Sequence, residues 1–135
     1  MLSSEASLMT KIMVVDDEKD VLYLLKVLME KENFQVIEAT NGLEAYNKLT
    51  SDIDPARPDV IVLDIMMPEM DGYTLQAKLQ EMDEFRNVPI IILTAKGQMK
   101  DLFELSTNIH AFVEKPFEPK NLVKIVKEAL NKNGN

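Results

Sequence analysis

The sequence predicts an α/β domain built on a doubly wound, five-stranded parallel sheet. Short apolar segments of strand length alternate, five times, with segments in which apolar residues recur at helical spacing. This alternation is typical of a parallel sheet whose two faces are covered by helices. Because crossovers between parallel strands are right-handed, few topologies remain for such a chain.

The first 50 residues predict two strand–helix pairs. We expect a buried strand over residues 11–15 and a helix over 19–31, where valine and leucine recur every three or four positions. Residues 35–39 form the second strand, and their polar flanks favour the edge of the sheet. An Asn-Gly turn signal then precedes a short helix over 43–49.

The middle of the chain holds two strongly apolar strands. We expect the central strand over residues 59–63 and another buried strand over 89–93. Between them, after a loop broken by proline and glycine, Leu75, Leu79 and Met82 share one stripe of a helix. A strand, a helix and a strand in this order continue the βα pattern.

The last third of the chain predicts the final elements. We expect a short, weak helix over residues 100–107 and the last strand over 110–114. Pro119 stands where a proline of the first helical turn belongs. Apolar residues stripe the final helix as far as Leu130.

Length, charge and cysteine content narrow the function classes. The 135 residues suffice for one domain, residues 11–131, with a flexible tail over 1–10 and a short tail over 132–135. A formal charge of −8 argues against direct nucleic-acid binding, and the lack of cysteine excludes disulfides and cysteine metal sites. Without a secretory signal or a membrane-length apolar stretch, we expect a cytoplasmic protein that does not bind membranes.

Four of the expected strands end in polar side chains. Asp16 and Asp17 follow the first strand, and Asp64 follows the third. Thr94 follows the fourth strand and Lys115 the fifth. In an open parallel sheet, sites form at the edge where the strands have their carboxyl ends. If the first and third strands are neighbours, the three carboxylates converge there.

Converging carboxylates predict a metal site and phosphoryl chemistry. Three such groups stay ionised only beside a cation; otherwise a pKa rises. Oxygen ligands without histidine or cysteine suit Mg²⁺, with Mn²⁺ as a second possibility. A carboxylate nucleophile, a divalent metal, a lysine and a hydroxyl are what in-line phosphoryl transfer to an aspartate needs. The sequence therefore predicts that Asp64 accepts a phosphoryl group.

Four short motifs carry these residues. They are Val14-Val15-Asp16-Asp17-Glu18, Leu63-Asp64-Ile65-Met66-Met67-Pro68-Glu69-Met70-Asp71-Gly72, Leu93-Thr94-Ala95 and Glu114-Lys115-Pro116-Phe117. Each motif alone is weak, but four in the right order, each at the end of an apolar segment, are highly specific. Together they resemble the receiver domain of two-component response regulators, of the chemotaxis-regulator type. The resemblance covers about residues 11–131.

The resemblance implies a flavodoxin-like (βα)5 fold with strand order 2-1-3-4-5. It also implies a metal site in which Asp17 and Asp64 bind Mg²⁺ directly and Asp16 acts mainly through water. The backbone carbonyl of Met66 would be a further ligand. On this resemblance Asp64 is the phosphoacceptor, and the protein is a signalling switch rather than an enzyme that turns over added substrates.

The remaining motif residues would serve transfer and switching. By the same resemblance, Thr94 hydrogen-bonds a phosphoryl oxygen and moves on activation, and Lys115 pairs with the phosphoryl group. The peptide bond between Lys115 and Pro116 would be cis. Phe112 stands at the position of the switch aromatic, where tyrosine is common, so it can report burial but cannot donate a hydroxyl hydrogen bond.

The implied partners are proteins. The phosphodonor would be a phosphohistidine on a sensor histidine kinase or on a histidine phosphotransfer protein. A downstream protein target would read a surface around the last helix–strand–helix. Since no output domain is recognisable, the chain is expected to be a stand-alone regulator, a relay intermediate or an excised receiver domain.

Several residues depart from the family pattern or have ordinary interpretations. Met66 stands where a side chain that positions an attacking water would help dephosphorylation, so we expect slow loss of the phosphoryl group. Asn108 can take the left-handed conformation of the glycine that is frequent there. Glu18 is expected to be a solvated helix end, and His110 an ordinary residue at the start of a strand.

Two other function classes share some of these features. A phosphatase of the haloacid dehalogenase type also uses an aspartate nucleophile, but it needs a second aspartate two positions later as general acid, where this chain has Met66. A flavodoxin-like cofactor binder needs a phosphate loop rich in serine, threonine or glycine after the first strand. Here that loop is acidic. Turnover of p-nitrophenyl phosphate would favour the phosphatase, and a yellow protein would favour the flavin binder.

Overall fold

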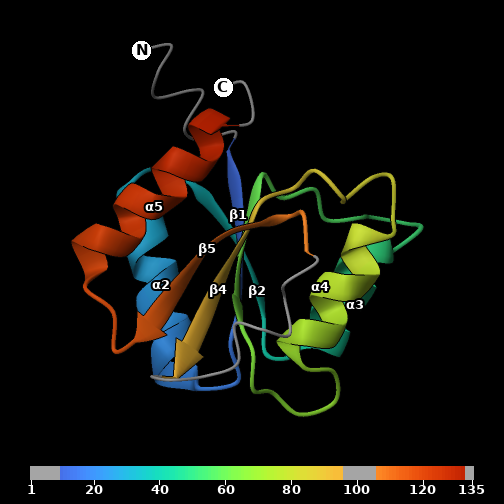
Figure 1. The fold of residues 1–135 in the computed structure, drawn as a ribbon, viewed down its shortest axis with the longest axis horizontal. Coiled ribbons are helices and arrows are strands. Elements are labelled where there is room, and N and C mark those ends of the chain that lie inside the picture. Colours follow the sequence, from blue (N-terminus) through green and yellow to red (C-terminus); the bar gives the residue numbers. More distant parts are fainter. Residues whose placement is uncertain (1–9, 96–105, 133–135) are drawn as a thin grey trace.

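The computed structural model of the protein describes residues 10–95 and 106–132. Its five strands form one parallel sheet in the order β2-β1-β3-β4-β5 (Figure 1), which confirms the expected fold class and strand order. The strands are β1 (Lys11–Val15), β2 (Gln35–Ala39), β3 (Val60–Asp64), β4 (Ile90–Ala95) and β5 (Ile109–Lys115). As expected, β2 lies at one edge and β3 in the centre.

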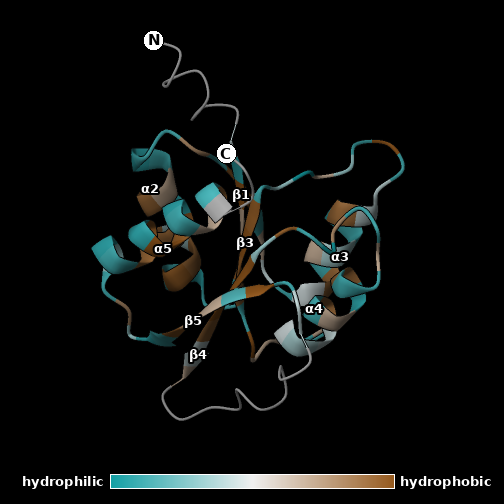
Figure 2. Ribbon diagram, turned by 45° about the horizontal axis from the view of Figure 1, so that its top comes forward, coloured by the Kyte–Doolittle hydropathy of each residue, from teal (hydrophilic) through white to brown (hydrophobic). Residues whose placement is uncertain are grey.

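Helices cover both faces of the sheet. Within the described residues they are α2 (Lys19–Lys31), α3 (Gly42–Thr50), α4 (Gly72–Gln80) and α5 (Pro119–Lys132). Helices α2 and α5 lie together on one face, and α3 and α4 on the other (Figures 1 and 2). Since successive strand residues point to opposite faces, Ile12 and Val14 pack under the first pair, and Met13 and Val15 under the second.

Local sequence explains where three of the helices begin or end. At the end of α2, the N–H groups of Asn33 and Phe34 donate to carbonyls of the last turn, and Asn33 has a φ of 66°. Asn41 caps α3, since its side chain accepts from the Glu44 N–H at 2.8 Å. Asp71 caps α4 by accepting from the Thr74 N–H at 2.7 Å.

Helix α4 is shorter than its apolar stripe predicts. Leu75 and Leu79 are buried in the helix, but α4 ends at Gln80, so Met82 lies in the turn that follows. There Met82 still packs against the core, and the turn buries Phe85, whose exposure is 1%. The turn residues include three acidic side chains, which the negative end of a longer helix would disfavour.

The start of β5 also differs from expectation. Asn108 does not have a positive φ; among the described non-glycine residues only Asn33 and Glu69 do. Instead the Asn108 side chain is buried and accepts a hydrogen bond from Gln76 Nε2 at 2.7 Å, and its carbonyl accepts from the Ile90 N–H. These bonds fix the turn without the left-handed conformation, and the register with β4 shifts beside it.

Some expectations fall outside the described residues. Most of the weak helix expected over 100–107 lies outside the described residues. Its last two residues are described, and they are not helical. The tail expected over 1–10 lies outside the described residues except for Thr10, while α5 continues to Lys132. Within the described residues, no helix has both the length and the apolar character that crossing a membrane requires.

The loop after β3 contains Glu69 in a strained backbone conformation, and relief of this strain should stabilise the protein. Glu69 has a φ of 69°, and this left-handed conformation costs about 1–2 kcal/mol for a residue with a Cβ atom. Glu69→Gly is expected to raise the free energy of unfolding by about 0.5–1 kcal/mol, because the relief exceeds the added chain entropy. Urea denaturation without Mg²⁺ measures it. Glu69→Ala keeps the strain, so an equal gain in both variants would contradict the backbone explanation.

Candidate functional site

The register of β1 and β3 creates the centre of the site. These strands are neighbours, with Val15 opposite Leu63, so Asp16 and Asp64 emerge side by side at the carboxyl edge. One carboxylate oxygen each from Asp16, Asp17 and Asp64 lies within 4.8 Å of the others. The structure therefore brings together the three carboxylates that the sequence singled out.

The three carboxylates differ in their surroundings. Asp16 is fully buried and Asp64 is 7% exposed, whereas Asp17 is exposed. The backbone N–H of Asp16 donates to the Ala39 carbonyl at 3.2 Å, and Asp16 Oδ1 accepts from the Glu18 N–H at 2.9 Å. Asp16 is thus fixed on both sides, while Asp17 faces solvent and can reach an incoming ion.

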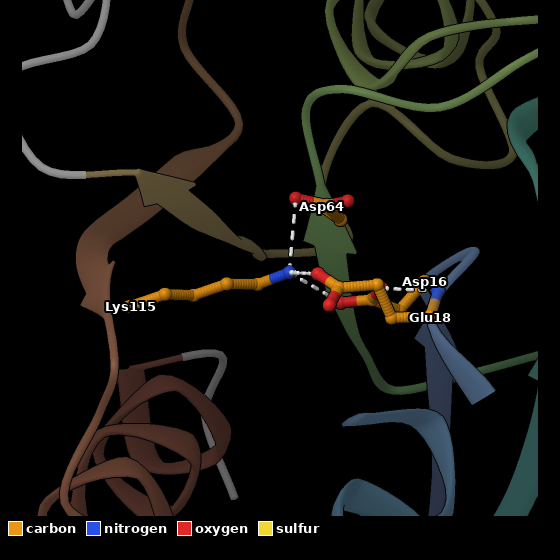
Figure 3. A network of polar contacts seen from close by, with 4 residues as sticks. All are labelled: Asp16, Glu18, Asp64 and Lys115. Atoms are coloured by element: carbon orange, nitrogen blue, oxygen red, sulfur yellow. Dashed lines mark hydrogen bonds and ion pairs between the residues drawn. The ribbon is translucent and has the colours of Figure 1, made fainter. Parts of the chain in front are cut away.

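Lys115 reaches this acidic cluster from the end of β5. Its Nζ lies 2.8 Å from Asp16 Oδ2 and 3.4 Å from Asp64 Oδ1 (Figure 3). A third carboxylate, from Glu18, lies 3.3 Å from the same nitrogen. The lysine side chain is 19% exposed, so these ion pairs are partly shielded from water.

The surroundings change the proton affinity of Asp64 and of Lys115. Burial and then the neighbouring charge of Asp16 raise the pKa of Asp64 to about 6, although Lys115 acts in the opposite direction. Burial by itself lowers the pKa of Lys115, but its bond to Asp16 and the charges of Asp64 and Asp16 raise it overall. Lys115 is therefore a permanent cation at neutral pH, and the carboxylates still lack a full counter-charge.

These donors fit Mg²⁺. Asp16, Asp17 and Asp64 carry three negative charges against the single positive charge of Lys115. All three offer hard oxygen atoms, and none of the clustered ligands is histidine or cysteine. A divalent ion would offset the repulsion that, together with burial, raises the pKa of Asp64. The Met66 carbonyl stays a predicted ligand.

Glycine allows the loop after β3 to close against the strand end. The Gly72 N–H donates to the Ile65 carbonyl at 2.8 Å, and a Cβ atom on Gly72 would lie 2.3 Å from the backbone oxygen of Asp64. Gly42 is equally confined, with its N–H donating to the Met70 carbonyl at 2.9 Å. The loop that follows Asp64 is thus held by backbone contacts on two sides.

The predicted switch residues lie on the strands next to the site. Thr94 is 1% exposed and directly follows Leu93, the register partner of Asp64. Phe112 pairs with Ile92 and is half-buried against the cluster under α3 and α4. The peptide bond between Lys115 and Pro116 is cis, as the resemblance implied. The roles of Thr94 and Phe112 in switching stay predictions.

Sequence reasoning missed one side chain of this cluster. Glu18 was interpreted as a solvated helix end, and it is 64% exposed, but it contacts Lys115. The missed signal is the unbroken Asp16-Asp17-Glu18 run, which places a third carboxylate one residue beyond the pair. Met66 is 62% exposed, so its side chain faces solvent beside the site.

Comparison with known proteins places most of the chain in one family. The family model described as the response regulator receiver domain matches residues 12–127. The response regulator SaeR of Staphylococcus epidermidis is 40% identical over 85% of this chain and 48% of its own length. SaeR of Staphylococcus aureus is 38% identical over 92% of this chain and 52% of its own. The chain therefore spans about half the length of these curated relatives.

Two solved structures of similar fold align with nearly the full length of this chain, and the alignment also covers nearly all of their own chains. The chemotaxis response regulator CheY4 of Vibrio cholerae superposes with a TM-score of 0.81 at 27% identity, covering 90% of this chain and 99% of that one. The response regulator TrrA of Thermotoga maritima, solved in complex with Mg²⁺ and BeF, gives 0.77 at 32% identity, covering 90% and 100%. With the site geometry and the family match, these likenesses show that the chain belongs to the response regulator receiver domains of two-component systems.

Proposed function

We propose that the protein is a phospho-accepting switch in which Asp64 receives a phosphoryl group from a partner phosphohistidine. The partner would be a sensor histidine kinase or a histidine phosphotransfer protein. The observation that carries the proposal is the convergence of Asp16, Asp17 and Asp64 within 4.8 Å, with Lys115 3.4 Å from Asp64. An exposed edge that holds a nucleophile, a metal-binding set and a cation suits phosphoryl transfer.

Each residue has a defined part in the transfer. An oxygen of Asp64 forms the new P–O bond while the P–N bond to the donor imidazole breaks and leaves its electron pair on that nitrogen. Lys115 and the Thr94 hydroxyl donate hydrogen bonds to phosphoryl oxygens. Asp16, Asp17 and Asp64 would hold Mg²⁺, which when bound supplies positive charge to the phosphoryl oxygens; Mn²⁺ has the same ligand preferences. The chain's own residues thus position and stabilise the group without turning over further substrate.

The output would follow from the new charge at the sheet edge. A phosphoryl group on Asp64 attracts the Thr94 hydroxyl from β4, and Phe112 on the adjacent strand adjusts its burial. This change biases the surface formed by the last helix–strand–helix, which a downstream protein reads. Met66 offers no general acid, so we propose no phosphatase activity on added substrates; turnover of p-nitrophenyl phosphate would contradict this.

Acetyl phosphate tests the proposal without a partner kinase. Incubation with Mg²⁺ is expected to add the mass of one phosphoryl group to the wild type and none to Asp64→Asn, because the amide is not a nucleophile. Asp52→Asn, which removes an exposed carboxylate from a distant loop, should gain the group normally. Lack of uptake by a folded wild type would overturn the proposal.

Met66 provides a prediction about the lifetime of the phosphorylated state. Its apolar, exposed side chain cannot orient a water molecule for attack. Met66→Asn is expected to speed autodephosphorylation by about tenfold or more, since a positioned polar group assists water attack. The decay of phosphorylated protein after removal of acetyl phosphate measures the rate. Met66→Leu should behave as the wild type, and a wild-type lifetime of only seconds would contradict the explanation.

A further inference from the structure

Glu18 has an unusual environment for a residue at the start of a helix. It occupies the N-cap position of α2 with an extended backbone, but its side chain makes no capping hydrogen bond. Its own N–H is instead held by Asp16 Oδ1 at 2.9 Å. The carboxylate therefore has no capping role of the kind that aspartate has at this position, and Figure 3 shows it directed toward Lys115.

The ammonium group of Lys115 is shared among three carboxylates. Hydrogen bonds run from Nζ to Asp16 Oδ2 at 2.8 Å and to Glu18 Oε1 at 3.3 Å, and Asp64 Oδ1 is an ion-pair partner at 3.4 Å. An ammonium group has only three N–H donors. Within the described residues, two of these donors are used by Asp16 and Glu18, and Asp64 lies close as the ion-pair partner. A phosphoryl oxygen that approaches Nζ therefore competes with carboxylates that already surround it.

The three partners differ in how easily they are displaced. Asp16 is fully buried and makes the shortest contact, and Asp64 is the group to be modified. Glu18 is 64% exposed, so water can solvate its carboxylate once the bond is broken. An exposed ion pair contributes little free energy. Glu18 is therefore the partner that Lys115 exchanges at the smallest cost.

We propose that Glu18 is a positioning residue that holds Lys115 in the unphosphorylated protein and is displaced by the phosphoryl group on Asp64. This inference rests on the proposed function and deepens it. The exposed negative charge of Glu18 also lies 3.3 Å from Lys115, so it repels an anionic donor that approaches this ammonium group. Both the contact and the charge oppose phosphoryl entry, so Glu18 slows uptake and disfavours the phosphorylated state.

Glu18→Gln tests the proposal, because glutamine keeps the shape and removes the charge. At saturating Mg²⁺ and limiting acetyl phosphate, we expect the uptake rate to rise about two- to fivefold, as expected for the loss of one exposed ion pair. The affinity for beryllofluoride, an unreactive phosphoryl mimic, should rise by a similar factor. An unchanged or slower rate for Glu18→Gln would overturn the proposal.

Asp20→Asn is the matched control for charge. Asp20 lies in the first turn of the same helix and is exposed, and it is not among the ion-pair partners of Lys115 within the described residues. Its substitution removes the same charge near the same helix end, so it should leave the rate close to the wild type. An equal acceleration by Asp20→Asn would show a general charge effect and would also overturn the role of Glu18.

A second readout does not depend on phosphoryl transfer. In the unphosphorylated protein, the ¹³Cε and ¹Hε resonances of Lys115 should shift with Glu18→Gln and not with Asp20→Asn, because only the former changes a direct contact. Unshifted resonances would overturn the holding role. If the wild type took up no phosphoryl group, the proposed function would fail; normal wild-type uptake with no effect of Glu18→Gln would overturn the exchange alone.

Discussion

Asp64→Asn is expected to raise the stability of the protein without Mg²⁺ while it removes phosphoryl uptake. The carboxylate of Asp64 is buried beside Asp16 and Asp17, and its pKa of about 6 shows that the fold disfavours its ionised form. The difference from the ordinary value of 3.8 corresponds to at most about 3 kcal/mol. Since water screens part of this edge, we expect a gain of about 1–2 kcal/mol at pH 7.

The pH dependence identifies the cause of this gain. The unfolded chain loses the proton of Asp64 near 3.8, whereas the folded protein keeps it up to about 6. The contribution of Asp64 to stability therefore falls as the pH rises through this window, and the full penalty is present above it. Denaturation of the wild type and of Asp64→Asn at a series of pH values should show curves that diverge across the window.

Two controls accompany this prediction. Asp52→Asn removes an exposed carboxylate, so its stability should follow the wild type at every pH. If Mg²⁺ binds the folded carboxylate cluster as proposed, saturating Mg²⁺ should stabilise the wild type and narrow its difference from Asp64→Asn. A difference between wild type and Asp64→Asn that does not change with pH would show that the ionised carboxylate of Asp64 is not the cause of the gain.

Gly72→Ala is expected to reduce both stability and phosphoryl uptake. The added Cβ atom would lie 2.3 Å from the backbone oxygen of Asp64 and 2.9 Å from Ile65 Cα, so backbone must move. Such overpacking costs about 1–3 kcal/mol. The displaced atoms belong to Asp64, the proposed phosphoacceptor, and to the residue after it, and a shift of about 1 Å in a reacting group can slow transfer about 100-fold.

Thermal unfolding and acetyl phosphate uptake measure the two effects of Gly72→Ala. Thr74→Ala, in the same helical turn, keeps the backbone N–H that donates to Asp71 Oδ1. This variant should therefore retain near-normal phosphoryl uptake. Uptake by Gly72→Ala should stay low at temperatures where the variant is folded. Normal uptake by the folded variant would show that the loop can relax without moving Asp64.

The sequence allowed prediction of those features that depend on periodicity and on strand ends. The sheet order and the convergence of Asp16, Asp17 and Asp64 follow from a parallel topology, because every strand has its carboxyl end at one edge. The Asp16-Asp17-Glu18 run indicates a third carboxylate at this edge, but not its partner, because the contact between Glu18 and Lys115 joins residues 97 positions apart. It could be found only once the strands were placed.

Long-range side-chain contacts also explain why the predicted end of α4 and the predicted conformation of Asn108 were wrong. The stripe of Leu75, Leu79 and Met82 fits a helix, but the chain turns after Gln80 because burial of Phe85 and the acidic turn outweigh helical continuation. Asn108 was expected to make the turn by adopting a left-handed backbone conformation. Instead its side chain holds the turn by accepting a hydrogen bond from Gln76 of α4. Tertiary contacts determine both the end of α4 and the turn at Asn108, and such contacts cannot be read from the periodicity of the sequence.

The bond between Lys115 and Asp16 joins residues 99 positions apart in the chain. A contact over this separation raises the contact order of the fold, and a high contact order slows folding. During synthesis, a nascent chain that has not yet released β5 from the ribosome lacks the lysine and with it a complete site. Lys115 is thus the last of the clustered residues to be synthesised, and the cation of the site is in place only after β5 has joined the sheet.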